Sequence, residues 1–316
     1  MIKYILIFLL SLAGCQKREA SDGSCWFQEN GKLKVLSTVA MIDDLVKEIG
    51  GERVDALCLI RGELDPHSYE IVKGDDEKFA RADLIFFNGL GLEHGLSLRQ
   101  HLEKNPKALA VTEALLKESP SPILFADESH EDPHVWMDIS LWARVVDPIV
   151  QALEKKCPEG AVEFKQRGCE LKKRMQAVDE EAFSLLQAIP AEKRYLVTSH
   201  DAFHYFARRY LAEPEEKNWQ KRCRAPEGLS PDSQLSVTDL LTIMSHIELF
   251  SIRVVFPESN ISRDSLKKLA SACQERGFTL NICDEKLYAD AMGTASSYTQ
   301  MISHNVHVIA KGLNQS

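Results

Sequence analysis

The tripeptide Asp-Pro-His occurs twice in this chain, as LDPHSYE at 64–70 and as EDPHVWMD at 131–138. Proline fixes its own φ and pushes the residue before it towards an extended conformation. Each copy is therefore a stiff bend that presents a histidine, His67 in the first and His134 in the second. One such histidine would mean little, but two indicate a site that needs several.

Two further candidate ligands follow expected strands in the second half of the chain. His200 ends the stretch RYLVTSH, and Asp290 lies in the loop beyond FTLNIC. In α/β proteins, functional groups gather at the carboxyl ends of the strands. Three imidazoles and a carboxylate form a nitrogen and oxygen set that suits Zn²⁺, Mn²⁺ or Fe²⁺. A lone histidine is more often structural, so the interpretation depends on all four residues together.

The elements that must position these residues alternate in α/β fashion from residue 33 onward. The stretch DLIFFNG is a near-continuous apolar run, which is typical of a strand buried on both faces of a parallel sheet. In the first half, the pattern predicts strands at 33–39, 54–60, 83–89 and 108–112, and helices at 40–51, 96–105 and 139–156.

The longest helical pattern spans roughly residues 160–188, and Pro190 stops it. It is charged and poor in apolar positions, as expected of a helix that bridges two lobes rather than one buried in either. Beyond it the α/β scheme repeats, and the polar stretch 213–232 is expected to be a surface loop. We therefore predict two α/β lobes joined by one long helix. The expected boundaries are 33–159 for the N-terminal lobe, 160–190 for the linker helix and 191–316 for the C-terminal lobe.

The N-terminus has the shape of an export signal. Its apolar run at 4–13 follows a single cation and is too short to span a bilayer as a helix. The letters LAGC that come next resemble the lipobox of bacterial lipoproteins, in which the cysteine becomes the lipid-modified first residue of the mature chain. The sequence thus predicts a signal peptide at 1–14, lipidation of Cys15 and a flexible tether at 15–32.

Composition narrows the choice of partner. Lys and Arg number 38 against 47 Asp and Glu, which gives a net charge of −9. This balance argues against a nucleic-acid partner and suits a cation ligand. The eight cysteines form no CxxC pair, so a zinc-ribbon site is not expected. Some can pair as disulfides in an exported protein, and the nearest pairs are Cys157–Cys169 and Cys273–Cys283.

Five motifs resemble, in order and spacing, the solute-binding lipoproteins of bacterial ABC importers for zinc, manganese and iron. They are DPHSYE, ADLIFFNGLGLE, DPHVWMD, SHDAFHYFARRYL and LYADAMG. The resemblance runs from about residue 33 to the C-terminus. It implies two Rossmann-like lobes, a rigid linking helix and one metal ion held between the lobes. Carried over residue by residue, the family's ligands fall on His67, His134, His200 and Asp290.

The resemblance also implies how the protein works. A protein of this kind captures one divalent ion and delivers it to an ABC permease and its ATPase complex. It is expected to be a monomer, lipid-anchored in the periplasm or at the outer face of the cytoplasmic membrane, and not an enzyme. The loop at 284–297 is then expected to close over the ion, with Gly293 permitting its rearrangement.

Two stretches depart from the family's pattern. Members dedicated to zinc often carry a long His-rich acidic loop before the second histidine, whereas FADESHEDPH holds one spare histidine, His130, as a candidate capture ligand. This difference weakens a purely zinc assignment. The stretch at 213–235 is longer and more charged than usual, and SPDSQLS lacks the family's Glu-Pro.

Two other functions stay open at this point. A secreted zinc-dependent hydrolase would need an open coordination position and a nearby general base, whereas four protein ligands close the shell. A surface adhesin on the same fold is compatible with a carrier role. The remaining histidines are interpreted as surface or core residues of helices: His94, His101, His204, His246, His304 and His307.

Overall fold

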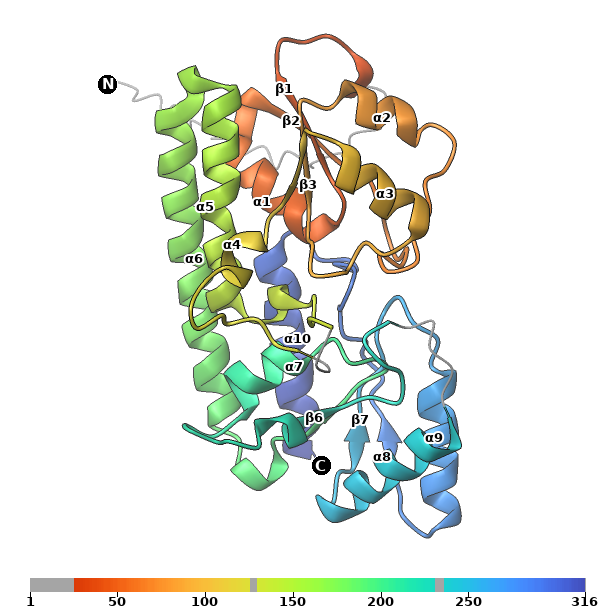
Figure 1. Cartoon of the computed structure of the whole chain (residues 1–316). Coiled ribbons are helices and arrows are strands. Elements are labelled where there is room, and N and C mark those ends of the chain that lie inside the picture. The colour runs from red at the N-terminus through yellow and green to blue at the C-terminus, as the bar shows by residue number, and fades with distance from the viewer. Residues whose placement is uncertain (1–25, 126–129, 231–235, 316) are drawn as a thin grey trace, which may run out of the picture.

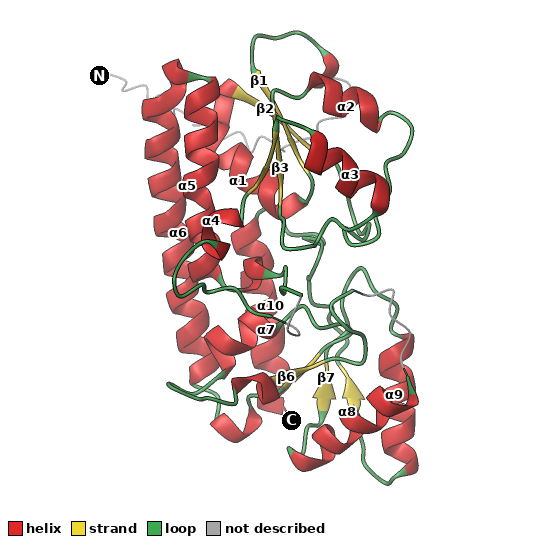
Figure 2. Cartoon of the chain, viewed as in Figure 1, coloured by secondary structure: helices red, strands yellow, loops and turns green. Residues whose placement is uncertain are grey.

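The structure is a computed structural model, and it describes residues 26–125, 130–230 and 236–315. The first half of the chain builds the upper part of Figure 1 and most of the second half the lower part, while one long green helix runs along one side of both. Strands lie inside each part, and many of the connecting loops gather between the two parts (Figure 2). The predicted α/β architecture is confirmed.

The first sheet is parallel throughout, with the strand order β2-β1-β3-β4. Buried apolar side chains cover both of its faces, one against α1 and α5 and the other against α2 and α3. This two-sided burial explains why the strand at 84–87, LIFF, is a continuous apolar run in the sequence. The elements are β1 Leu33–Ser37, α1 Ala40–Gly50, β2 Val54–Cys58, α2 Asp75–Arg81, β3 Leu84–Phe87, α3 Leu96–Lys104, β4 Ala108–Ala110 and α4 Glu113–Leu116.

Helices α5 (Ile139–Lys156) and α6 (Ala161–Gln187) lie side by side in Figure 1. The 27-residue α6 contacts α1 and α5 from the first half of the chain and α10 (Tyr298–Gln315) from the second half. One buried cluster continues from β1 through α5 and α6 into α10, so the two halves share a core. The long helix that the sequence predicts is thus present, and it contacts elements of both halves.

The second half pairs β5 with β6 and β7 with β8, again in parallel. The backbone N–H of Phe256 donates to the carbonyl of Val197 at 2.8 Å, which places β7 beside β5. The elements are β5 Leu196–Val197, α7 His204–Phe206, a π-helical turn Ala207–Leu211, a 3₁₀ turn Trp219–Arg222, β6 Cys223–Arg224, α8 Val237–Leu249, β7 Val254–Val255, α9 Asp264–Glu275 and β8 Asn281–Ile282.

The prediction of a surface loop at 213–232 is wrong for its central part. The stretch contains β6, and Cys223 is fully buried. Arg222 is also buried, and its Nε lies 3.0 Å from a carboxylate oxygen of Glu216. Charged residues can be buried when they are paired with an opposite charge. The sequence shows the charged residues but not their pairing, and for this reason it predicts an exposed loop.

The tether predicted at 15–32 ends earlier than expected. Trp26 is 2% exposed, and its indole N–H donates to the carbonyl of Asp55 at 3.0 Å. Residues from 26 onward are therefore attached to the first sheet. Cys15 and the predicted signal peptide lie outside the described residues.

The described cysteines form no disulfide, so neither of the two nearest pairs is bonded. The free thiols are Cys58, Cys157, Cys169, Cys223, Cys273 and Cys283. Among the helices of the described segments, none combines the length and apolarity needed to cross a membrane.

Candidate metal centre

The repeated Asp-Pro-His tripeptide forms the same local turn in both places. The carboxylate of Asp65 accepts a hydrogen bond from the backbone N–H of His67 at 2.8 Å. The carboxylate of Asp132 accepts the corresponding bond from His134 at 3.0 Å. Both are turns in which an aspartate side chain binds the backbone two residues on. The aspartate, as well as the proline, thus holds each histidine in place.

The other two candidate residues follow strands of the second half. His200 comes three residues after the end of β5, and its backbone forms a parallel bridge with Glu227. Asp290 lies in the segment between β8 and α10. These positions agree with the expectation that ligand side chains follow the carboxyl ends of parallel strands.

The four candidate side chains meet at one place in the fold. One ligand atom from each residue lies within 4.8 Å of the other three, and all four residues are buried. Asp290 Oδ2 lies 3.2 Å from His200 Nε2 and 3.9 Å from His67 Nε2, and Asp290 Oδ1 lies 3.5 Å from His134 Nε2. No described residue hydrogen-bonds the three Nε2 atoms or Asp290 Oδ1. Buried polar atoms normally have partners, and one cation would satisfy all four.

In two of the histidines, a carboxylate is hydrogen-bonded to Nδ1, the ring nitrogen that faces away from the site. Asp132 lies 2.7 Å from His134 Nδ1, and Glu258 lies 2.5 Å from His200 Nδ1. A carboxylate can only accept these bonds, so each Nδ1 carries the hydrogen and each Nε2 is directed at the site. The sequence analysis identified neither residue. The repeated aspartate of the tripeptide was an available signal for Asp132, but no local pattern marks Glu258.

The same carboxylates set the charge of the site. Burial opposes a charged His200, but Glu258 and Asp290 outweigh it and hold the pKa of His200 well above its ordinary value. Burial likewise opposes a charged Asp290, yet His200 and the other two imidazoles hold the pKa of Asp290 well below its usual range. Burial lowers the pKa of His67 to about 3, so this imidazole is neutral near pH 7. The buried site therefore holds a protonated His200 beside an ionised Asp290 near pH 7.

The loop that carries Asp290 is packed and hydrogen-bonded in this structure, and its closing over an ion stays a prediction. Ala289 is fully buried, and its carbonyl accepts a hydrogen bond from the indole of Trp136 at 2.9 Å. Gly293 has a φ of +54°, and a Cβ built on it would lie 2.0 Å from the ring of Tyr288. The backbone conformation and the close contact both favour glycine at this position.

A cavity of about 390 Å³ borders the site, and His67 lines it together with His94, His130 and Glu131. His94 lies in the loop before α3, not in a helix as expected, and its ring centroid is 5.5 Å from that of His67. Neither His94 nor His130 belongs to the group of four buried ligand atoms. The cavity beside the site is thus lined by imidazole and carboxylate groups, which are types of group that bind metal cations.

The letters HEDPH at 130–134 also match the HExxH spacing of zinc metalloproteases, a match that the sequence argument against a hydrolase left out. That motif requires both histidines on one face of a helix. Here residues 130–134 are not helical, and His134 Nδ1 is bound to Asp132. The match is therefore confined to the sequence, and these residues do not have the helical arrangement of the metalloprotease motif.

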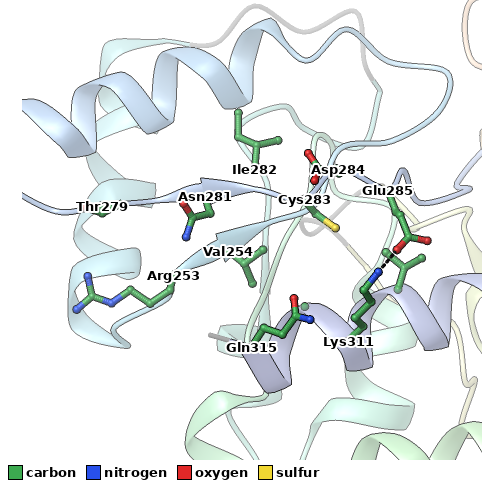
Figure 3. A pocket seen from close by; sticks show the side chains of 12 residues that line it. Arg253, Val254, Thr279, Asn281, Ile282, Cys283, Asp284, Glu285, Lys311 and Gln315 are labelled. Carbon is green, nitrogen blue, oxygen red and sulfur yellow. Dashed lines mark hydrogen bonds and ion pairs between the residues drawn. The ribbon is translucent and has the colours of Figure 1, made fainter.

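The most voluminous of the cavities described, about 530 Å³, lies elsewhere. Figure 3 shows it between β8 and the end of α10, where Lys311 pairs with Glu285 at 2.7 Å. It contains none of the four candidate ligands. The concentration of functional groups, and not cavity size, identifies the site.

Fold and site together define a class: an α/β binding protein with one preformed, enclosed position for a metal ion. The family model described as "Zinc-uptake complex component A periplasmic" (ZnuA) matches residues 35–312. The chain belongs to this family, the metal-binding solute-binding proteins of ABC importers.

Individual relatives agree with this assignment. The chain is 39% identical to the metal-binding protein YtgA of Chlamydia trachomatis, over 98% of this chain and 95% of that one. It is 31% identical to the manganese-binding lipoprotein MntA of Bacillus subtilis, over 98% of this chain and 97% of that one. The structure of Fe(III)-bound YtgA from C. trachomatis matches with a TM-score of 0.84 at 38% identity, over 89% of this chain and 98% of that one. The zinc-binding protein TroA of Treponema pallidum matches with a TM-score of 0.81 at 34% identity, over 90% of this chain and 99% of that one. The resemblance and the fold predicted from the sequence are thereby confirmed.

Proposed function

We propose that this protein captures one divalent transition-metal ion outside the cytoplasm and delivers it to an ABC permease and its ATPase. The observation that carries the proposal is the group of three imidazole Nε2 atoms and one carboxylate within 4.8 Å, all buried. These residues come from segments far apart in the chain. No described residue forms a hydrogen bond with the three Nε2 atoms or with Asp290 Oδ1. A binding protein needs an enclosed site of this kind, because the ion must be held during transfer.

The proposed ligands are His67, His134, His200 and Asp290, as the sequence analysis selected them. A site of three imidazoles and one carboxylate accepts Zn²⁺, Mn²⁺ and Fe²⁺. MntA is named a manganese-binding protein and TroA a zinc-binding protein, and the matching structure of YtgA is bound to Fe(III). Zinc is expected to bind more tightly than manganese in vitro, because nitrogen and oxygen sites follow that general order of affinity.

Binding without turnover is the expected behaviour. A catalytic metal keeps an open position for water or substrate, whereas here four protein groups would surround the ion. We therefore expect no hydrolysis of ester, peptide or phosphate substrates by the zinc-loaded protein. Turnover of any of these substrates by the zinc-loaded protein would instead support the alternative function, a secreted zinc-dependent hydrolase.

The proposal also includes export of the protein and its attachment to the membrane by a lipid. The run LAGC ends on Cys15, and MntA and other relatives are named lipoproteins. We propose a lipid-anchored monomer in the periplasm or at the outer face of the cytoplasmic membrane. Cys15→Ser should move the mature protein from the membrane fraction to the soluble fraction. A wild-type protein that is already soluble after export would contradict lipidation.

The test of the binding site is metal stoichiometry. Purified protein should bind one zinc ion per chain, and His67→Ala, His134→Ala and His200→Ala should each weaken binding substantially. His307→Ala is a matched control, because this histidine is on α10 and exposed. Unchanged affinity in any one of the three variants would remove that histidine from the site. Retained tight binding in the triple variant would end the proposal.

A further inference from the structure

His67 differs from the other three candidate ligands in its surroundings. Its side chain is 2% exposed, whereas the side chains of His134, His200 and Asp290 are 0% exposed. Of these four described residues, His67 alone lines the neighbouring cavity of about 390 Å³. An ion that passes between this cavity and the site would therefore contact His67 first.

The ring of His67 is also held by fewer hydrogen bonds than the other two imidazoles. The rings of His134 and His200 each donate a hydrogen bond from Nδ1 to a buried carboxylate. The bond from the His67 backbone to Asp65, 2.8 Å long, fixes the main chain and not the ring. Among the described residues, rotation of the His67 ring breaks no hydrogen bond, whereas rotation of either other ring breaks a buried one.

A fourth imidazole, that of His94, lies at the same cavity and is exposed to solvent. Its ring centroid is 5.5 Å from that of His67. The centroids of His134 and His200 lie 5.3 and 6.2 Å from that of His67. The exposed imidazole is thus as close to His67 as the candidate ligands are, although it is not one of the four buried groups.

The ring of His94 is oriented by a backbone carbonyl. The carbonyl oxygen of Gly91 lies 3.2 Å from Nδ1 of His94. A carbonyl can only accept a hydrogen bond, so in the neutral imidazole Nδ1 carries the hydrogen and Nε2 keeps its lone pair. A carbonyl often has this role behind a histidine that binds metal. His94 is therefore in the form that can bind a metal ion through Nε2.

The two loops that carry His67 and His94 are fixed to each other. A Cβ built on Gly95 would lie 2.0 Å from the carbonyl oxygen of Tyr69, so the two backbones are in direct contact. The carboxylate of Glu70 accepts hydrogen bonds from two backbone N–H groups at the start of α3, both 2.8 Å long. The short distance between the two imidazoles is therefore part of the fold.

We propose that His94 is a transient ligand on the route of the ion, which binds His94 and then His67 on entry and leaves in the reverse order. This inference rests on the proposed function. His67 is the first of the four ligands to contact the ion and the first to release it, because its ring borders the cavity and has no carboxylate partner among the described residues. His94 contacts the ion only in passage, since it lies outside the group of four.

The test measures zinc kinetics and zinc affinity separately. Zinc-loaded protein is mixed with an excess of a chromophoric chelator to obtain the dissociation rate constant, and competition at equilibrium gives Kd. Their ratio is the association rate constant. His94→Gln should lower both rate constants about tenfold, the lower end of the effect of concentrating an ion at a cleft, and leave Kd unchanged. Substitutions in a binding site usually change mainly the dissociation rate, and with it Kd.

His94→Glu is the matched variant, because it has the shape of His94→Gln but supplies a carboxylate, which is a zinc ligand. Its two rate constants should lie closer to those of wild type than the rate constants of His94→Gln do. His307→Ala is the control for the loss of an exposed histidine, since His307 is on α10. It should have the rate constants and the Kd of wild type.

Three outcomes would overturn the inference. The first is wild-type rate constants in His94→Gln. The second is a change in the Kd of His94→Gln, which would make His94 part of the site that holds the ion. The third is equally slow exchange in His94→Gln and His94→Glu, which would assign the effect to the lost ring and not to a lost ligand. A wild-type protein that does not bind zinc would contradict the proposed function itself, whereas these three outcomes leave that function intact.

Discussion

Glu258 holds His200 through its backbone and its side chain at once. One carboxylate oxygen accepts the backbone N–H of His200 at 2.9 Å, and the other accepts the ring Nδ1–H at 2.5 Å. Both residues are fully buried. The ring can therefore neither rotate nor change tautomer without breaking a buried hydrogen bond. Its Nε2 faces Asp290 before any metal is bound.

The first prediction concerns this support. Glu258→Gln keeps the size of the side chain but removes the charge that orients and polarises His200. We expect zinc affinity to fall about 10–100-fold, as is usual when the partner of a metal-binding histidine is lost. Competition with a chromophoric chelator measures the change. Glu275→Gln is the control, since this exposed residue ends α9 away from the site. An affinity within twofold of wild type for Glu258→Gln would show that the support is dispensable.

The second prediction concerns protons. The pKa of His200 is held well above its ordinary value by Glu258 and Asp290, against the effect of burial. The metal-free site therefore keeps a proton on His200 near pH 7, and zinc must displace it. We expect release of about one proton per ion, and an affinity that falls about tenfold per pH unit as pH decreases.

Isothermal titration in buffers of different ionisation enthalpy measures this proton release. His67 should contribute little, because its pKa is lowered to about 3 and it is already neutral. Glu258→Gln should release fewer protons than wild type, since the carboxylate that raises the pKa of His200 is gone. A binding enthalpy that is independent of the buffer would contradict this account.

The third prediction concerns the loop that carries Asp290. Gly293→Ala adds a Cβ 2.0 Å from the ring of Tyr288, at a φ of +54°. Gly277→Ala is a matched control, because Gly277 has a φ of +80° and nothing within 4 Å of the added Cβ. Both variants should lose about 1 kcal/mol of stability from backbone strain. Only Gly293→Ala should lose more than that and also weaken zinc binding, because Tyr288 must move. Equal effects on zinc binding would mean that the loop tolerates displacement.

The fourth prediction concerns the contact between α1 and α10. The carboxylate of Asp44 accepts the backbone N–H of Tyr298, the first residue of α10, at 2.8 Å. Burial raises the pKa of Asp44 from 3.8 to about 6. The folded chain therefore binds this proton more tightly than the unfolded chain does. The stability that this group contributes is present in full below pH 3.8 and decreases as pH rises to about 6.

The loss over that range is on the order of 3 kcal/mol, from a shift of about two pKa units. Asp44→Asn retains an acceptor for Tyr298 and cannot ionise, so its free energy of unfolding should vary less between pH 4 and pH 8. Urea denaturation of the two proteins at both pH values measures the difference. Parallel pH profiles would show that Asp44 does not titrate in this range.

Much of the fold could be read from local pattern. Strand β3 is a continuous apolar run, and α6 is a long charged helical pattern. Helix α2 was missed because its seven residues, DDEKFAR, hold too few apolar positions to show a period. The partly polar strand β6 was missed because Cys223 and Arg224 carry no signal of pairing with β5.

The sequence by itself determined which residues could bind a metal. The Asp-Pro-His tripeptide is a local turn, and a histidine or aspartate after a strand is placed by the strand. Only the tertiary structure decided which distant residues form hydrogen bonds with these side chains. Glu258 is 58 positions from His200 and Asn260 is 30 from Asp290, and both meet their partners because β7 lies between β5 and β8. Hydrogen bonds between such distant residues depend on strand order, which chain folding sets and which no spacing in the sequence records.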